Sequence, residues 1–256
     1  MDSNTTPPAD ALPNGTNPSV PEFQPEWILF QGGGLLAINK PSGLPVHRGT
    51  DHDQGLAECI EAWSRLHPGV VELRVGRPIL PLHRLDREAT GVVLFGLTRT
   101  TARKVQTAFA AHEIAKKYIA VVAGAVEPSG RLQGKVRARL RGTYRWLPAE
   151  LEYRRLGGDE RLNVVEVLTG QGRTHQIRSL FAQAGRPLAG DLRYGKPKPS
   201  RQFLEKFGVP SFLLHASELK LGASILGAAR TLEAPLPETF RKVADKKGWP
   251  ASVLGG

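Results

Sequence analysis

The apolar residues of this chain occur in short runs that end at glycine or proline, and few folds are compatible with that pattern. LLAINKPSG (35–43), GVVLFGLT (91–98) and KKYIAVVAG (116–124) each have the length of a buried strand. No run approaches the ~18 uninterrupted apolar residues of a membrane helix, and the N-terminus has no apolar signal core. The runs therefore predict β-strands of a soluble protein that has no membrane partner.

Two other segments place apolar residues at helical spacing. A helix is expected within 98–112, after threonines that can cap it, and another within 174–185, with Thr174 as N-cap and Gly185 beyond its end. The two apolar stripes consist of Ala102, Val105, Ala108 and Phe109, and of Ile177, Leu180, Phe181 and Ala184. Strands and helices are interspersed without regular βαβ repetition, which favours an α+β fold over a doubly wound one.

The N-terminal segment differs in composition from the rest of the chain. Residues 1–25 contain six prolines with many Asn, Thr and Ser and few apolar residues, so they cannot repay the entropy of ordering. We predict a disordered tail over 1–25 and one folded domain over 26–256.

The charge balance points to a polyanionic partner. The 35 Lys and Arg residues exceed the 24 Asp and Glu residues, which gives a net charge of +11. Nucleic acid is the favoured partner, and an anionic membrane surface or plain solubility are the alternatives. The single cysteine, Cys59, cannot form an internal disulfide, so we expect a reducing compartment, the cytoplasm.

The segment GKVRARLRG (134–142) concentrates part of this charge. If it is a strand, its four cations share one face, and apolar side chains occupy the other. The cations are Lys135, Arg137, Arg139 and Arg141. We predict that they follow an RNA backbone, the alternative being a solvated sheet face. Tyr144 and Trp146 could stack on unpaired bases, but a small core is the favoured interpretation for them.

In the motif LHRLDREATG (82–91), one carboxylate, that of Asp86, lies between Arg84 and Arg87. Cationic neighbours favour the charged form of such a group, which can then be a nucleophile or an electrostatic partner, but not a general acid. The alternative is simple charge balance. Arg178, at the edge of the apolar stripe of the 174–185 helix, could hold a carboxylate in bidentate geometry, or could be a surface arginine.

Other chemistries find less support. The seven histidines are scattered without ligand spacing, and neither a GxSxG elbow nor a GxxxxGK[ST] loop occurs. The glycine-rich turn GQGRT (170–174) could cradle a phosphate or be only a tight turn. A hydrolytic glycosidase normally needs two carboxylates across the scissile bond, whereas these cation-rich segments offer one obvious acid, Asp86. A reaction on a glycosidic bond would thus be one that needs no carboxylic acid to protonate the leaving group.

Five segments, in order, resemble the RluA-like family of RNA pseudouridine synthases. HRLDREATG (83–91) is similar to the family's HRLDRxTSG motif, and GRTHQIR (172–178) with GRPLAGDLRYG (185–195) is similar to its GRTHQIR…GHPIxGDxxYG segment. LLAINKPSGLPVH (35–47), KKYIAVVAG and LLHASELKL (213–221) resemble further family segments. The resemblance covers about residues 27–237.

The resemblance implies a pseudouridine synthase fold, with a mixed, mostly antiparallel central sheet flanked by helices and an active-site cleft across the sheet. It implies isomerisation of uridine in tRNA or rRNA to pseudouridine, without cofactor or metal. Asp86 would be the catalytic aspartate, Tyr118 would stack on the flipped base and could assist proton removal at C5, and Arg178 would pair with Asp86. The expected RNA-binding residues, besides the four cations above, are His83, Arg84, Arg87, Thr90, Arg173, Thr174, His175 and Gln176.

The chain departs from the family pattern in two places. Ala89-Thr90 replaces a Thr-Ser pair, and Ser179-Leu180 replaces Val-His, without removing an expected catalytic residue. We expect a monomer that lacks the N-terminal S4 RNA-binding domain of many relatives. The competing hypothesis is a basic RNA-binding or ribosome-assembly protein on a synthase scaffold, with secondary or lost catalysis.

Overall fold

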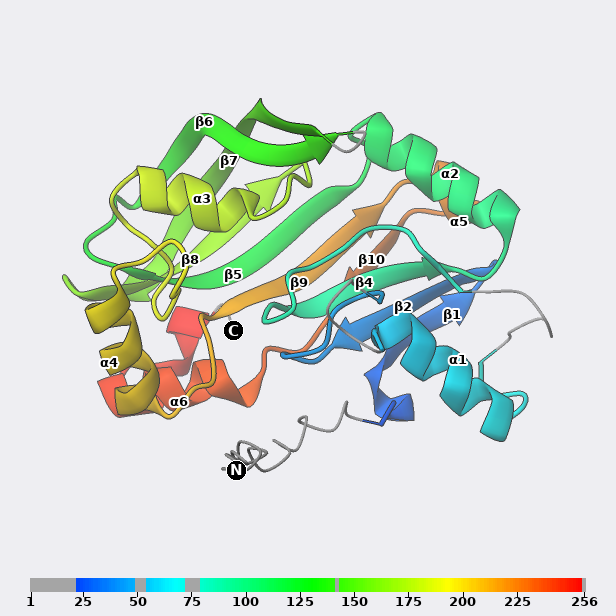
Figure 1. Ribbon diagram of the computed structural model, residues 1–256, viewed down its shortest axis with the longest axis horizontal. Coiled ribbons are helices and arrows are strands. Elements are labelled where there is room, and N and C mark those ends of the chain that lie inside the picture. Colours follow the sequence, from blue (N-terminus) through cyan, green and yellow to red (C-terminus); the bar gives the residue numbers. More distant parts are fainter. Residues whose placement is uncertain (1–21, 49–53, 72–78, 141–142, 255–256) are drawn as a thin grey trace, which may run out of the picture.

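A mixed sheet of ten strands forms the centre of the molecule in the computed structural model, which describes residues 22–48, 54–71, 79–140 and 143–254 (Figure 1). Its strands are β1 (Ile28–Gly32), β2 (Leu35–Lys40), β3 (Leu80–Pro81), β4 (Thr90–Gly96), β5 (Ala115–Ala123), β6 (Ser129–Leu140), β7 (Thr143–Gly158), β8 (Leu162–Thr169), β9 (Leu214–Leu221) and β10 (Arg230–Glu233). The order is β1-β2-β4-β9-β5-β8-β7-β6, with β3 beside β4 and β10 beside β9. Among the described strands only β4 and β9 pair in parallel, so the predicted α+β fold with a mostly antiparallel sheet is confirmed.

Helices cover both faces of the sheet because the strands alternate apolar side chains between them. The helices are α1 (Leu56–Leu66), α2 (Arg99–Ala110), α3 (Gln176–Gln183), α4 (Pro197–Phe207), α5 (Ala223–Leu226) and α6 (Glu238–Lys247). On β2, Leu36 and Ile38 belong to the same core as α1 and α3, whereas Leu35 and Ala37 pack with α2 and α5. Helices α4 and α6 form a third cluster against β5 and β8. The candidate site lies on the face that carries α1 and α3.

The predicted strands and helices are present. Two predicted boundaries need correction: the start of α3 and the start of the folded domain. Helix α3 begins at Gln176, and its N-cap is His175 in a left-handed conformation (φ 53°) rather than Thr174. The reason is local: the carboxamide of Gln176 accepts the Arg173 backbone N–H at 3.0 Å, and the Gln176 N–H donates to the Arg173 carbonyl at 3.1 Å, so residues 173–176 form a turn before the helix. Residues 1–21 of the predicted tail lie outside the described residues. Phe23 is buried against Trp27 and Trp63, so the folded part begins before residue 26.

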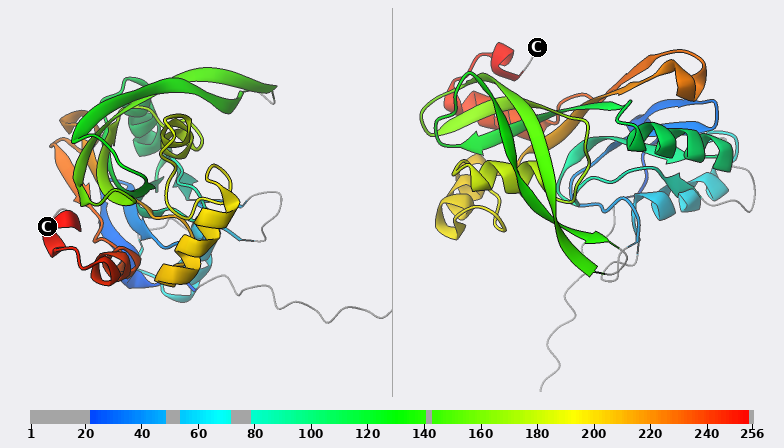
Figure 2. Two further views of the ribbon diagram at one scale, coloured as in Figure 1. Left: turned by 90° about the vertical axis from the view of Figure 1, so that its left-hand side faces the viewer. Right: turned by 90° about the horizontal axis from the view of Figure 1, so that it is seen from above.

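The hairpin of β6 and β7 extends beyond the other strands and arches over α3 (Figure 2). Val136 and Ala138 are buried and Lys135 and Arg137 are exposed, as the alternation predicted. Arg141 and the side chain of Arg139 lie outside the described residues. Tyr144 and Trp146 are 57% and 65% exposed, which contradicts the favoured interpretation of a small core. Trp146 lies opposite the exposed Arg137 in the register of β6 and β7, so its side chain is on the solvent-facing side of the hairpin.

Gly91 is where the Asp86 motif joins the sheet. Its φ is +106°, and a Cβ there would lie 2.2 Å from the carbonyl oxygen of Ala216 on β9. Only glycine permits this approach of β4 and β9. Gly91 therefore fixes where the loop that carries Asp86 joins the sheet. Among the described helices, none is long and apolar enough to cross a membrane.

Candidate active site

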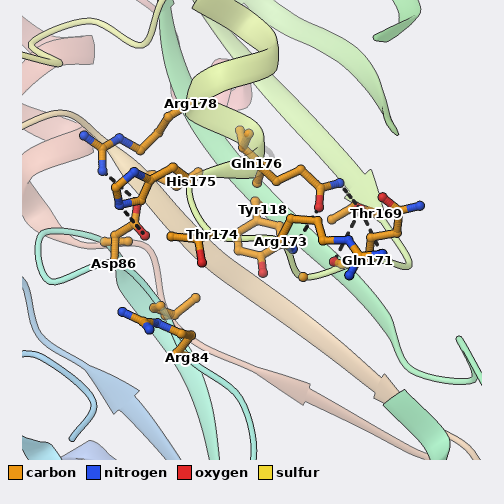
Figure 3. Close-up of a pocket in the computed structure, with 15 residues that line it drawn as sticks. Arg84, Asp86, Tyr118, Thr169, Gln171, Arg173, Thr174, His175, Gln176 and Arg178 are labelled. Carbon is orange, nitrogen blue, oxygen red and sulfur yellow. Dashed lines mark hydrogen bonds and ion pairs between the residues drawn. The ribbon is translucent and has the colours of Figure 1, made fainter. Parts of the chain in front are cut away.

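Asp86 lies on the loop that leads into β4, and its side chain lines a pocket between this loop, β5 and the start of α3 (Figure 3). Leu85 and Ala89 on either side of it are buried, and the Ala89 N–H donates to the Asp86 carbonyl at 3.1 Å. These contacts anchor the loop on the core. The Asp86 side chain stays 15% exposed, enough for a ligand to reach it.

Arg178 contacts Asp86 directly, as the sequence predicted. Its Nη1 donates to Asp86 Oδ2 at 2.9 Å, although the two residues are 92 positions apart. The bidentate geometry expected of Arg178 is present, but with another carboxylate: Nε and Nη2 donate to Asp191 at 2.7 and 3.0 Å. The guanidinium also lies 4.2 Å from the centre of the Phe212 ring. One donor of Arg178 is thus aimed at Asp86 by partners that hold the rest.

Asp191 is a second acid of the site, and it was missed from the sequence. It is fully buried, and its Oδ1 also accepts the backbone N–H groups of Arg193 and Tyr194 at 2.9 and 3.0 Å. Burial alone would raise the pKa of Asp191, but Arg178 and these two N–H groups hold it below its usual value. Burial opposes the charge of Arg178, yet Asp191 and Asp86 raise the pKa of its guanidinium. The available signal was the segment GRPLAGDLRYG, whose only acid is Asp191.

His175 approaches Asp86 from the other side. Its Nε2 is 3.7 Å from Asp86 Oδ1 (Figure 3). Its Nδ1 is 3.0 Å from the Tyr194 hydroxyl. Burial lowers the pKa of His175, the charge of Asp86 opposes that change, and Arg178 and Arg193 add to it. The balance favours the neutral imidazole, so His175 offers a polar contact rather than a second cation beside Asp86.

Tyr118 lies on β5, with its ring toward the pocket and an apolar surface around it. The surface comprises Leu85, Ala89, Ile177 and Leu214. Burial, followed by the charge of Asp86, raises the pKa of the Tyr118 hydroxyl. The phenol therefore stays protonated near neutral pH. Its ring provides a flat apolar face within the same pocket as the Asp86 carboxylate.

Several other predicted residues also line this pocket: Arg84, Arg173, Thr174, His175 and Gln176. Gln176 is fully engaged, because its Nε2 donates to the Glu150 carbonyl at 2.7 Å and to Thr169 Oγ1 at 3.0 Å. It ties α3 to the sheet. Arg84, Arg173 and Thr174 are exposed at the rim, so their side chains are available to a polyanion.

Three predicted residues of the Asp86 motif do not line this pocket. Arg87 donates through Nε to the Gly43 carbonyl at 2.8 Å, and Thr90 Oγ1 is 2.8 Å from His215 Nδ1. His83 accepts the Leu94 N–H at Nε2 at 3.1 Å, and burial lowers its pKa to about 3. These three side chains connect the loop to its surroundings; His83 borders one adjoining hollow, and Thr90 borders another.

Lys40 is a further residue that the sequence did not single out. It is fully buried, and its Nζ donates to the carbonyls of Pro41, Leu44 and Arg87 at 2.7, 2.7 and 2.9 Å. Burial lowers the pKa of Lys40 to about 7, against the opposing charges of Glu88 and Asp86. Lys40 thus joins the 41–44 turn to the Asp86 loop. In the described part of the chain, no group of three His, Cys, Asp or Glu side chains could hold a metal ion.

Comparison with known proteins places this site in a wider context. Residues 34–183 match a family described as RNA pseudouridylate synthase, and they include Asp86, Tyr118 and Arg178. The tRNA pseudouridine synthase C of Vibrio vulnificus (strain CMCP6) is 28% identical over 251 residues, which cover 89% of this chain and 97% of that protein. The tRNA pseudouridine synthase C of Salmonella typhi is 30% identical over 245 residues, 87% of this chain and 90% of that protein.

A solved structure shares the fold. Human RNA Pseudouridylate Synthase Domain Containing 4 superimposes with a TM-score of 0.69 at 23% identity, over 87% of this chain and 93% of that chain. The superposed part takes in most of the sheet and helices described above. The predicted pseudouridine synthase fold is thereby confirmed.

Proposed function

The chain belongs to the RNA pseudouridylate synthase family and is an RNA pseudouridine synthase, and we propose that it isomerises a uridine of tRNA with Asp86 as its catalytic residue. The observation that carries the proposal is the meeting of Asp86, Arg178 and Tyr118 in one pocket. The three come from the loop before β4, from α3 and from β5. A protein that only binds RNA has no need of this arrangement, so the alternative of lost catalysis is not favoured.

The geometry supports a role for Asp86 at the ribose of a flipped uridine. The carboxylate accepts one N–H from Arg178 at Oδ2, while Oδ1 is directed toward the open pocket near His175. Asp86 would attack C1′ or remove a ribose proton, and in both routes uracil departs as a stabilised anion that needs no acid. The base then turns and rejoins the ribose through C5, which releases Asp86 from C1′ or is accompanied by return of the ribose proton. Loss of the C5 proton to solvent and protonation of N1 complete the isomerisation. No water is consumed, which agrees with a pocket that offers no free second acid.

Tyr118 would stack on the flipped base. Extrusion of a base costs a few kcal/mol, and stacking on an aromatic ring offsets part of that cost. The raised pKa of its hydroxyl supports a stacking role over one as a phenolate base at C5. Arg84, Arg173 and Thr174 at the rim would contact the RNA around the target.

The relatives favour tRNA among the possible substrates. The curated proteins of similar length that match this chain are named tRNA pseudouridine synthase C. The exposed cations Lys135 and Arg137 of the β6–β7 hairpin, with Tyr144 and Trp146 beside them, would grip RNA outside the pocket. Arg137 stacks over the Tyr144 ring at 4.1 Å, and Trp146 is its cross-strand neighbour.

Purified protein and unmodified transcripts test the choice of substrate. Transcripts of total tRNA and of rRNA, carrying tritium at C5 of uridine, release tritium when pseudouridine forms. We expect release from at least one tRNA and none from rRNA at equal concentration. Release from rRNA alone would contradict the proposal for tRNA while leaving the class of reaction unchanged.

A further inference from the structure

Lys116 is a buried cation that has no acidic partner among the described residues. It lies on β5 and is only 5% exposed, yet no carboxylate lies within ion-pair distance of its Nζ. Its neighbour Lys117 points to the opposite face of the strand and pairs with Glu218 at 2.9 Å. A buried ammonium group without a counter-charge is energetically unfavourable. Burial accordingly lowers the pKa of Lys116 to about 8. An anion that binds from outside would remove that cost.

The Lys116 side chain borders a hollow of about 450 Å³ beside the Asp86 pocket. The hollow and the pocket share Arg84, Tyr118, Gln171, Gly172 and Arg173 as walls, so a bound chain can pass from one to the other. None of the residues that line the hollow is acidic. Its charged walls are therefore all positive.

Phe109 and Gly172, two neighbours of the Lys116 ammonium group, leave one side of it accessible to a ligand. Phe109 supports it from one side, with the ring centre 5.1 Å from Nζ. On another side lies Gly172, where an added Cβ would be 3.1 Å from Nζ. A side chain at position 172 would cover the ammonium, whereas glycine keeps the approach free. The glycine-rich turn 170–174 thus also keeps the approach to the Lys116 ammonium group free.

We propose that Lys116 binds a backbone phosphate of the nucleotide next to the target uridine. The inference rests on the proposed function, because it places the target base on Tyr118. Residues 116 and 118 share one face of β5 and are about 7 Å apart along the strand, a span that one nucleotide bridges. Lysine is a common point-charge ligand of phosphate, and phosphate contacts set the register of RNA without reading its sequence. Arg84 and Arg173 flank the same path.

Lys116→Gln and Lys117→Gln form a matched pair that tests the proposal. Each removes one charge from the same strand, but only Lys116 faces the hollow, and Glu218 keeps Lys220 at 3.4 Å when Lys117 is lost. Both are made in protein that carries Asp86→Asn, so that binding to a tRNA transcript is measured without turnover. We expect Lys116→Gln to weaken binding about tenfold and to reduce the slope of log Kd against log salt by about 0.7–0.9. Lys117→Gln should leave both unchanged.

Gly172→Ala provides a second test that keeps the charge and the fold of β5. Its methyl group would crowd the Lys116 ammonium, so RNA binding should weaken in the same direction. Equal effects of the two lysine variants, or none from Lys116→Gln and Gly172→Ala, would overturn the inference. Such a result leaves the proposed function intact, since the role of Asp86 and the choice of tRNA are tested separately, by pseudouridine formation in Asp86→Asn and by tritium release from tRNA and rRNA transcripts.

Discussion

Asp86 and Asp191 share one guanidinium, and the division of its donors separates the tasks of the two acids. Asp191 is fully buried and takes two donors of Arg178, whereas the more accessible Asp86 takes one. Asp86 therefore keeps an oxygen free toward the pocket. We regard Asp191 as a positioning residue, because it holds Arg178 and does not line the pocket itself.

Asp191→Asn should expose this division. The amide cannot accept both Arg178 donors and both backbone N–H groups, so a buried guanidinium loses one counter-charge. Asp86 remains as the single counter-charge of Arg178. We expect the free energy of unfolding to fall by about 3 kcal/mol and kcat to fall more than KM rises. Urea unfolding and steady-state kinetics measure the two effects. Asp245→Asn on the exposed face of α6 is the control, and a variant that matches it in both assays would refute the positioning role.

At the residue scale, the sequence predicted which residues pair more successfully than it predicted the geometry of their contacts. The pairing of Asp86 with Arg178 followed from the family resemblance and from the place of Arg178 on its helix. The bidentate contact with Asp191 could not be predicted, because it depends on how the 185–195 loop folds back onto α3. Lys116 was overlooked for a similar reason, since a strand pattern does not tell which lysine of a pair is buried without a partner.

At the scale of elements, β9 is the strand that connects the two halves of the site. His215 on β9 is fully buried, its Nδ1 lies against the Thr90 hydroxyl, and its Nε2 is 3.1 Å from the Ala234 carbonyl. Both contacts suit a neutral ring, which donates from Nε2 and accepts at Nδ1. Burial lowers the pKa of His215 to about 4, against the opposing effect of the Ala234 carbonyl.

Acid should therefore weaken the fold through His215. Its folded pKa lies below the unfolded value of about 6.5, so the unfolded chain takes up the proton first. Stability that is present above pH 6.5 is lost as the pH falls toward 4, about 2 kcal/mol by pH 5 for this one group. Urea unfolding at pH 7 and pH 5 should show this loss in the wild type and a smaller loss in His215→Asn. Identical losses in the two proteins would contradict the account.

Element boundaries were predictable where side-chain patterns decide them and not where a tertiary contact does. The runs that became β2, β4 and β5 carry their own period and end signals. The start of α3 differs from the prediction because a turn over residues 173–176, closed by Gln176, precedes the helix. The exposure of Tyr144 and Trp146 depends on how far the β6–β7 hairpin extends past the sheet, which no local pattern records.

At the scale of the whole molecule, the site is built where segments distant in sequence meet on one sheet. The order β4-β9-β5 brings the Asp86 loop beside Tyr118, and α3 covers them from the same face. The sequence indicated an α+β fold from its interspersed strands and helices, the family resemblance implied a mostly antiparallel sheet, and the strand order came only with the structure. Long-range pairing such as β4 with β9 joins positions over 120 residues apart, which periodicity does not encode.

The central claim is that Asp86 carries out the isomerisation, and Asp86→Asn tests it most directly. The amide can still accept the Arg178 N–H, so the fold and RNA binding should persist. Glu88→Gln, on the same loop but outside the pocket, removes an equal charge and serves as the control. Tritium release from a tRNA transcript should fall at least about a thousandfold in Asp86→Asn, with Kd for RNA unchanged, and remain normal in Glu88→Gln. Normal release by Asp86→Asn would contradict the account.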